Sequence, residues 1–551
     1  MNALEPCGPR SKARIGRGIG GDRARLVAAG ARKPGAVARH LALITLVALT
    51  AIPGCGVRGV SRDVIFGVAS QPNSMDPLAA PDIYSRWATE LVYDGLVDIN
   101  DRLEVIPALA ASWQTSDDGL TWDFALRRDV RWHDGTALTA IDVRRTYETI
   151  QDPAAAVTLP RSDFQSIERV ENPDDWTVRL VLRQPDASLL TKLTVGIAKR
   201  RSVATTPRQT SGGTAGDLVG TGPFVLQEWL SGERLVFLAN RDYYGGAPGL
   251  DRLIWQVVPN ESSLVVLLQN GGIDGGLVEA PLDADRLVAA GNMRAYPEPG
   301  GNVQVSLRMS DPLFEDARVR RALGLAVDRP AMIAGLLNGR GLLSAGDIPP
   351  TSWAYNPAAA SLNTYDPDQS RALLAEAGWH PDSARVLVRD GKRLAFTLST
   401  DAGSQLRREV ALTVRQDWQA IGAAVELEFV ERNAFVVERV LKGQFQAALL
   451  QSSARADPDL SRRFHSRAIA SGQNFLGYAN PALDALLDQA LKHSAPSARA
   501  LLYREAQMLL ARELPQINLF YPTVYYVVRA DIGGIRPSAM GPFWNVEEWG
   551  R

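Results

Sequence analysis

Residues that carry chemistry are scarce in this sequence: 551 positions hold two cysteines and five histidines. The histidines are scattered singly, and none pairs with another at the spacing of metal ligands: they are His40, His133, His380, His465 and His493. A G-x-S-x-G elbow and a Walker A loop are also missing, and a carboxylate dyad is not detectable from one sequence. The one G-x-G-x-x-G, at Gly16, Gly18 and Gly21, follows no predicted strand. We therefore expect no catalytic residue, no bound metal and no cofactor.

Clustered positive charge is confined to the first forty residues, which hold nine Lys and Arg against two acidic residues. Residues 41–52 form an uncharged apolar run, too short to span a bilayer but of the length of a signal-peptide core. The run ends in Ile52-Pro53-Gly54-Cys55, which resembles a bacterial lipobox. We expect residues 1–55 to be a signal peptide and Cys55 to carry a lipid anchor to the membrane. The alternative is a short buried helix followed by a chance cysteine.

If residues 1–55 form a signal peptide, Cys7 lies inside the segment that would be removed. The mature chain would hold a single cysteine and no internal disulfide. It would keep 51 basic and 59 acidic residues. Since phosphate binding requires clustered Lys and Arg, we expect no nucleic-acid partner.

Length and periodicity predict more than one domain. Residues 64–68 read as a buried strand and residues 84–96 as a helix. An alternating pattern around Asp118-Gly119 predicts a hairpin within an α+β unit at about 102–200, where Thr139 begins a helix. Beyond residue 300, helix and strand patterns alternate, as in an α/β lobe. Strands predicted at 517–521 and 524–528 should pair with the first lobe.

Nearly the whole chain after residue 55 resembles the family 5 extracellular solute-binding proteins, which serve ABC importers. The resemblance is carried by eight stretches in a fixed order: PALAASW at 107–113, DGLTWDF at 118–124, LRRDVRWHDG at 126–135, LTAIDV at 138–143, GTGPF at 220–224, NRDYYGGAP at 240–248, RVRRAL at 318–323 with AVDR at 326–329, and YANPALD at 478–484. Within these stretches we expect Trp113, Trp122 and Trp132 to pack the hairpin unit.

The resemblance implies an α/β (α+β) fold of the bilobal periplasmic-binding-protein type, with two hinge-linked lobes and an extra domain inserted in lobe 1. It divides the chain into a signal peptide (1–55), lobe 1 (56–101, 201–299 and 513–551), the inserted domain (102–200) and lobe 2 (300–512). Such a protein is an extracytoplasmic, monomeric substrate-binding subunit that captures peptides for ABC permease and ATPase subunits. Three alternatives stay open: a non-peptide solute such as an oligosaccharide or metal chelate, a lipoprotein scaffold or regulator on the same fold, and a hydrolase.

Peptide-binding members of the family carry a W-x-x-D stretch shortly before an Asp-Pro, and its aspartate pairs with the peptide's α-ammonium group. In this chain Gln451 and Ala454 stand at those two positions, with Arg455 beside them and Asp457 before Pro458. Asp457 either replaces the missing aspartate or caps the following helix. The expected ligand contacts are Ser74, Met75, Asn302, Trp353, Tyr355, Arg455 and Asp457.

Overall fold

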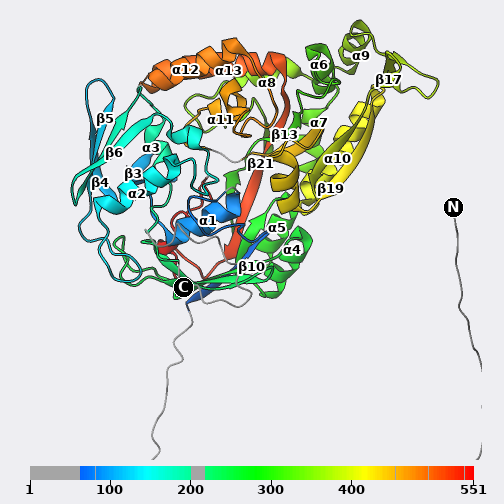
Figure 1. Ribbon diagram of the computed structural model, residues 1–551. Coiled ribbons are helices and arrows are strands. Elements are labelled where there is room, and N and C mark those ends of the chain that lie inside the picture. Colours follow the sequence, from blue (N-terminus) through cyan, green and yellow to red (C-terminus); the bar gives the residue numbers. More distant parts are fainter. Residues whose placement is uncertain (1–61, 81, 200–217, 453–454, 494, 539) are drawn as a thin grey trace, which may run out of the picture. The chain divides into compact units, whose positions relative to one another are not determined.

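The computed structural model describes residues 62–80, 82–199, 218–452, 455–493, 495–538 and 540–551, shown as ribbons in Figure 1. Cys55 and Ala454 lie outside the described residues. Strand β21 (Gln516–Arg529), red in Figure 1, belongs to a sheet of the order β19-β18-β20-β13-β21-β11-β1-β10-β9-β8. We call the part of this sheet built from β1 and β8–β12 the first lobe. The part built from β13, β14 and β18–β20 is the second lobe.

The sheet of the first lobe is mixed. Its strand β1 pairs in parallel with β10 and β11. Val64, Phe66 and Val68 of β1 are buried and alternate along the strand, as a strand in a covered sheet requires. The elements of this lobe are β1 (Asp63–Val68), α1 (Ile83–Val92), β8 (Phe224–Leu230), β9 (Arg234–Ala239), β10 (Arg252–Val257), α4 (Glu261–Asn270), β11 (Gly275–Val278), α5 (Pro281–Ala289) and β12 (Met293–Pro299).

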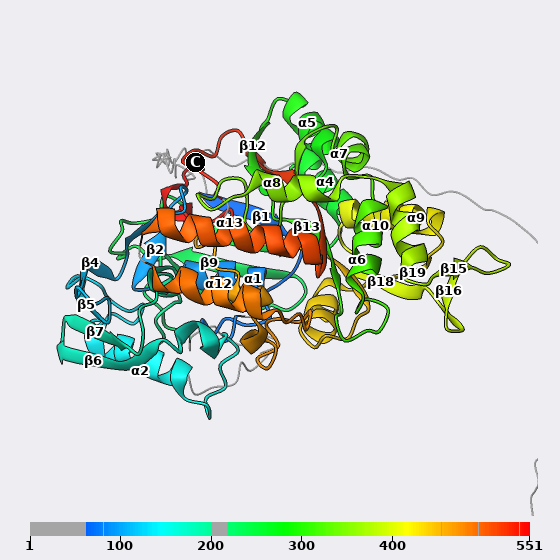
Figure 2. The same ribbon diagram turned by 90° about the horizontal axis from the view of Figure 1, so that it is seen from above.

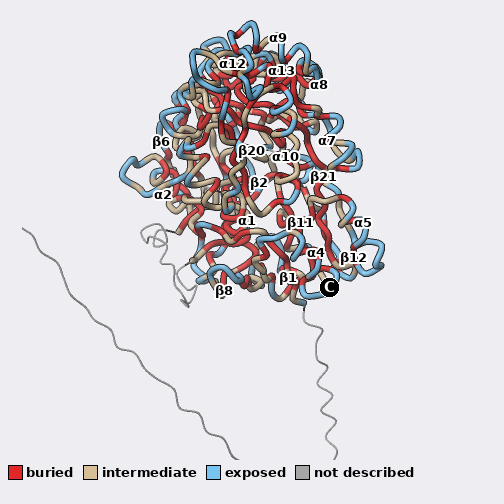
Figure 3. The backbone as a smooth tube through the Cα atoms, turned by 90° about the vertical axis from the view of Figure 1, so that its right-hand side faces the viewer, coloured by how far each residue is buried: buried red, intermediate tan, exposed pale blue. Residues whose placement is uncertain are grey.

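The second lobe covers its sheet with helices, as its α/β pattern predicts. Its elements are β13 (Val303–Leu307), α6 (Ala317–Leu325), α7 (Arg329–Leu336), β14 (Gly341–Leu343), α8 (Pro357–Ala360), α9 (Pro367–Glu376), β15 (His380–Pro381), β16 (Leu387–Arg389), β17 (Lys392–Arg393), β18 (Ala395–Asp401), α10 (Gln405–Ala420), β19 (Ala424–Val430), β20 (Ala447–Gln451), α11 (Ser461–Phe464), α12 (Pro481–Lys492) and α13 (Pro496–Glu513). Helices α12 and α13 pack side by side, as Figure 2 shows. Strand β13 is wholly buried and β20 largely so, and Figure 3 colours buried backbone red.

A separate four-stranded antiparallel sheet, in the order β4-β5-β7-β6, forms the predicted α+β unit. Its elements are β2 (Val97–Ile99), β3 (Val105–Pro107), β4 (Ala110–Thr115), β5 (Thr121–Leu126), α2 (Ala140–Gln151), β6 (Ile167–Asp174), β7 (Thr177–Leu182) and α3 (Leu189–Lys192). The hairpin at Asp118-Gly119 is confirmed, because β4 and β5 pair across it. Trp132 is buried in the core of this unit, and Trp113 and Trp122 pack against that core. The sequence prediction for all three tryptophans is therefore confirmed.

The two lobes are connected where two segments cross. Strand β12 of the first lobe leads through Gly300 to β13 of the second, and β21 passes beside this connection. The carbonyl of Pro522, midway along β21, accepts the backbone N–H of Gly300 at 2.7 Å. The sequence predicted two tail strands pairing with the first lobe. Instead β21 is continuous, with its second half on β11 and β12 and its first half on β13 of the second lobe.

Within these described residues, no helix has both the length and the apolar character needed to cross a membrane.

Close packing of Gly220 against the end of α1 yields a first testable prediction. A Cβ atom at Gly220 would lie 1.8 Å from the carbonyl oxygen of Val92, so the backbone would have to move. We expect Gly220→Ala to lower the free energy of unfolding by about 2 kcal/mol. The matched control is Gly335→Ala in α7, where a Cβ meets nothing within 4 Å. Gly335→Ala should raise the free energy of unfolding by about 0.5–1 kcal/mol. Urea unfolding measures both variants, and equal effects would show that close packing at Gly220 is not what makes it sensitive.

Candidate functional site

A cleft lies between α1 of the first lobe, residues from 158–164 and 188–196 near the α+β unit, and several segments of the second lobe. It consists of three adjoining cavities of about 310, 180 and 330 Å³, all lined by Ile83 at the start of α1. The second lobe contributes residues 432–436 and 449–452, and the loop and short helix from Arg455 to Arg463. The N-cap of α1 is Asp82, whose carboxylate accepts the N–H groups of Tyr84 and Ser85 at 3.0 Å. This cap fixes the first turn of α1 in the cleft wall.

One side of the cleft is closed by a buried ionic contact between the lobes, which we call the latch. Arg407 of α10 donates from Nε to Asp401 at 2.7 Å and from Nη1 to Gln451 at 2.7 Å and to Glu279 at 3.2 Å. Glu279 follows β11 and so belongs to the first lobe, whereas the other three belong to the second. Ser404 donates its hydroxyl to the same Glu279 carboxylate at 2.5 Å. The latch thus joins the two lobes through one buried carboxylate.

The charges of the latch are set by burial and by its neighbours. Burial alone would raise the pKa of Asp401, but the positive charges of Arg407 and Arg432 lower it to about 2. The side chains of Arg407 and Asp401 are only 4% and 6% exposed. Both groups are therefore ionised throughout the physiological pH range, and each depends on the other for its charge balance.

Glu261 of α4 supports the latch from within the first lobe. Its carboxylate accepts the backbone N–H groups of Glu279 at 2.7 Å and Ala280 at 3.1 Å. Burial, and then the charge of Glu279, raise the pKa of Glu261 to about 7. A raised carboxyl pKa adds stability that is present below the unfolded value of 4.5 and is lost as the pH rises through 7.

This shift predicts a pH-dependent gain for Glu261→Gln, which keeps the amide oxygen as an acceptor and removes the charge. Relative to the parent, we expect the variant to be about 2 kcal/mol more stable at pH 8 and little changed at pH 5. Urea unfolding at the two pH values measures the difference. Glu376→Gln, at an exposed position, should show no such pH dependence. A gain for Glu261→Gln that is the same at both pH values would rule out the ionisation argument.

Besides Arg407 and Arg432 beside the latch, four arginines line the same cleft, which we call the cleft arginines: Arg86 of α1, Arg455 after β20, and Arg462 and Arg463 of α11. The Nε and Nη2 atoms of Arg86 and the Nη1 atom of Arg463 are buried and make no hydrogen bond within the described residues. Arg462 donates from Nε to Gln473 at 2.7 Å, and the guanidinium of Arg463 lies 4.4 Å from the centre of the Phe475 ring. Arg455 is exposed and has no hydrogen bond or ion pair to any residue that the structure describes.

Of the seven sequence-predicted ligand contacts, the cavities bring together two, Arg455 and Asp457. The Asp457 carboxylate accepts Nη2 of Arg499 at 2.7 Å, and these two side chains are 10% and 5% exposed. It also accepts the N–H of Asp459 at 3.0 Å. Burial alone would lower the pKa of Arg499, but Asp457 beside it raises it, so the guanidinium stays charged.

The other five predicted contacts lie outside the lining of these cavities. Met75 is buried in the core of the first lobe, and the Ser74 hydroxyl accepts the N–H of Asp76 at 3.0 Å. The Asn302 amide donates to Asp347 at 3.1 Å and to Asn518 at 2.8 Å near the crossing segments. Trp353 is 40% exposed and Tyr355 packs against the cores around α13.

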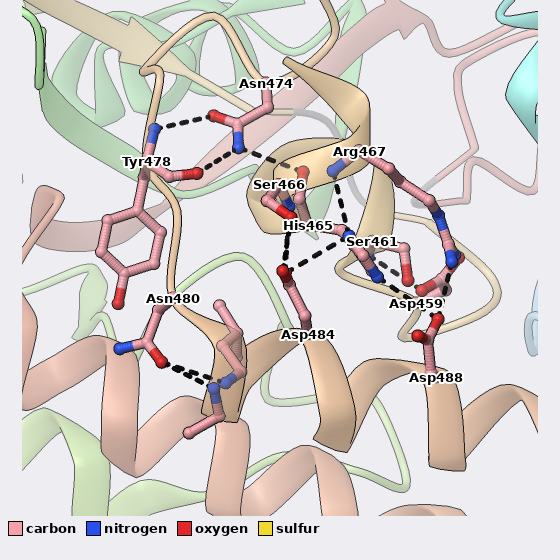
Figure 4. Close-up of polar contacts among 12 residues, drawn as sticks. Asp459, Ser461, His465, Ser466, Arg467, Asn474, Tyr478, Asn480, Asp484 and Asp488 are labelled. Carbon is pink, nitrogen blue, oxygen red and sulfur yellow. Dashed lines mark hydrogen bonds and ion pairs between the residues drawn. The ribbon is translucent and has the colours of Figure 1, made fainter. Parts of the chain in front are cut away.

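One histidine is surrounded by carboxylates, and Figure 4 shows it between Asp484 and Asp488 of α12. Nδ1 of His465 accepts the backbone N–H of Arg467 at 3.1 Å, so we assign the proton to Nε2, which lies 3.3 Å from Asp488. Asp484 accepts the N–H of Ser466 at 2.9 Å. This network holds the 465–480 loop on α12. His465 does not line the cleft, and among the described residues no group of three or more His, Cys, Asp and Glu could hold a metal ion.

Comparison with known proteins gives the family. The profile described as bacterial extracellular solute-binding proteins, family 5 Middle, matches residues 104–469, well over half of the chain. The chain belongs to the family 5 bacterial extracellular solute-binding proteins. The matched region includes the α+β unit from β3 onward, the connection from β12 to β13 and most of the second lobe, so the resemblance seen in the sequence is confirmed.

Solved family 5 members share this fold. The chain is 28% identical over 510 residues to the oligopeptide-binding protein AppA of Bacillus subtilis (strain 168), covering 88% of this chain and 91% of AppA. The structure of AppA in complex with a nonapeptide aligns with 89% of this chain and 98% of its own, at a TM-score of 0.82 and 27% identity. NikZ from Campylobacter jejuni, in complex with Ni(L-His), aligns with 89% of this chain and 100% of its own, at a TM-score of 0.80 and 25% identity. The predicted bilobal α/β fold is confirmed.

Sequence reasoning missed the latch and three of the four cleft arginines. Arg407 and Glu279 are 128 positions apart, and their contact depends on how the lobes meet. A signal did exist for Arg462 and Arg463, because two consecutive arginines follow shortly after Arg455 and Asp457, which were recognised. Arg86 gave no such signal, since an arginine on a helix is usually solvated.

Proposed function

We propose that this family 5 protein is the extracytoplasmic substrate-binding subunit of an ABC importer, which captures a peptide or related small solute between its lobes and delivers it to the permease. The observation that carries this proposal is the cleft between α1 and the second lobe, closed on one side by the latch. The cavities have volumes in or near the range of small-molecule sites. A solute that contacts both walls would favour the closed arrangement, because those contacts exist together only there.

AppA and NikZ support this reading, since one was solved with a nonapeptide and the other with a nickel–histidine complex. Both ligands are small solutes, and neither requires a catalytic group. We therefore propose that this chain binds and releases its solute unchanged. An affinity near 1 µM, about −8 kcal/mol, would hold the solute and still permit release to a transporter.

The proposal keeps residues 102–200 as a domain inserted in lobe 1. It also keeps Cys55 as the lipidated residue that tethers a monomer outside the cytoplasm. Of the seven predicted ligand contacts, Arg455 and Asp457 line two of the cavities. We propose Arg455 as the one that touches the solute directly, because it is exposed whereas the Asp457 carboxylate is held by Arg499.

Thermal unfolding with a panel of di- to nonapeptides tests the binding function. A ligand present at 100 times its Kd stabilises the folded state by about 2.7 kcal/mol. We expect at least one peptide or other small solute to raise Tm in a concentration-dependent manner. The control is the Ile83→Trp variant, whose larger side chain would occupy part of the cleft. Comparing its Tm shift with that of the wild-type protein separates binding in the cleft from binding at the surface. A shift that survives in the Ile83→Trp variant would place the solute elsewhere and refute the cleft as the binding site.

A further inference from the structure

We propose that the cleft recognises its solute through a carboxylate or other anionic group held by Arg86, Arg455, Arg462 and Arg463, and not through a free α-ammonium group. This inference rests on the proposed function and specifies the class of solute. Arg86 comes from the first lobe and the other three from the second, so one anion between them would contact both walls.

Arg86 and Arg463 have buried guanidinium nitrogens that make no hydrogen bond to any described residue. Buried guanidinium N–H groups without an acceptor are costly, and Arg86 leaves two such nitrogens and Arg463 one. Arg86 has one carboxylate nearby, Glu90, at 3.7 Å from its Nε. That distance is longer than a hydrogen bond, and the Glu90 side chain is 46% exposed, so solvent screens its attraction for Arg86. A bound carboxylate or phosphate supplies the acceptors that the protein leaves out.

The four cleft arginines also repel one another. Burial, and then the charge of Arg455, lower the pKa of Arg462 to about 10. Burial also lowers the pKa values of Arg86 and Arg463; Glu90 and Asp347 respectively oppose this effect, and the charge of Arg455 adds to it by a smaller amount. Like charges gathered in a partly desolvated cleft are unfavourable until an anion enters.

Most of the carboxylates that line the cleft already accept hydrogen bonds from the protein. Asp457 is bound by Arg499, Asp82 caps α1, and Asp459 accepts the N–H of Ser461 at 2.9 Å. Asp347 accepts the amides of Asn302 at 3.1 Å and Gln516 at 3.2 Å. The position of the family's amine-binding aspartate is Ala454. Asp163 and Glu90 also line the cleft, but each lies beside one of its arginines: the charge of Asp163 raises the pKa of Arg462, and Glu90 is 3.7 Å from Nε of Arg86. An α-ammonium group would therefore compete with a guanidinium for these two carboxylates.

The experiment measures binding of four probes by isothermal titration calorimetry: tri-alanine, N-acetyl-tri-alanine, tri-alanine amide and citrate. We expect N-acetyl-tri-alanine or citrate to bind. Acetylation should raise the Kd of tri-alanine by less than threefold, whereas converting its carboxylate to the amide should raise the Kd by about tenfold or more. Raising the salt concentration should weaken binding of the anionic probes.

Two variants locate the site. Arg455→Ala removes an exposed side chain without partners, so it should fold normally, and we expect it to weaken anion binding about tenfold, with Arg455→Glu weaker still. The control is Arg467→Ala, whose side chain pairs with Asp488 outside the cleft and should leave the Kd unchanged. Equal or tighter binding of the amide would overturn the anion proposal and leave the binding function intact. Failure of all four probes, with no small solute recovered from the purified protein, would overturn both.

Discussion

Arg407→Ala is expected to lower the free energy of unfolding by about 3–5 kcal/mol, the range found when one member of a buried ion pair is removed. The substitution leaves Asp401 and Glu279 buried, at 6% and 13% exposure, without the guanidinium that neutralises them. Arg432, whose Nη2 is 3.6 Å from Asp401, replaces only part of that charge. Urea unfolding at pH 7 measures the loss.

Two further variants separate the role of the latch in stability from its role in closing the lobes. Arg408→Ala, the next residue on α10, removes one hydrogen bond to the carbonyl of Ala402 and should cost about 1 kcal/mol. Glu279→Ala leaves Arg407 with Asp401 and Gln451, so its main effect should fall on the contact between lobes and appear as a larger radius of gyration in solution scattering. An Arg407→Ala loss no greater than that of Arg408→Ala would show that the latch is not a major stabilising contact.

Arg499→Leu is the second substitution for which we expect a large loss, again about 3–5 kcal/mol. The Arg499 guanidinium pairs with Asp457 at 2.7 Å and donates to the hydroxyl of Tyr503 at 3.1 Å. It also lies 5.4 Å from the ring centre of Trp353, which explains how that partly exposed tryptophan is held. Leucine fills a similar volume but leaves the Asp457 carboxylate buried and alone.

The control for this prediction is Arg504→Ala, at an exposed position of the same helix α13, which should change the free energy of unfolding by less than about 0.5 kcal/mol. Asp457→Asn combined with Arg499→Leu should recover part of the loss, because no charge then remains unpaired. If the double variant were less stable than Arg499→Leu alone, the loss would have to come from packing and not from the buried charge.

Much of the fold followed from local pattern. Helix α10 ends at Ala420, two residues before Gly422 at φ +95°, and α4 is capped by Gly271 at φ +73°, as is typical of glycine at a helix end. Thr139 is the N-cap of α2, and the hairpin formed where Asp118-Gly119 predicted it. These features depend on neighbours a few residues apart, so a sequence reading can reach them.

The tail and the candidate site were harder, for a physical reason. Two tail strands were predicted, at 517–521 and 524–528. Pro522 lies between these ranges, yet β21 runs through it, and its carbonyl accepts the N–H of Gly300 where β21 passes the connection between the lobes. Asp457 had two sequence interpretations, and the structure pairs it with Arg499, 42 residues away. Contacts between distant side chains are set by tertiary packing, which no local pattern encodes.

The central claim is that the cleft captures a small solute, and native mass spectrometry of the protein purified from its own cells, without denaturation, tests it most directly. We predict a complex heavier than the polypeptide by the mass of one small molecule, with that molecule released on mild activation and bearing an anionic group. A protein that carries no small molecule, and that binds none when the extract of the growth medium is added back, would contradict the account.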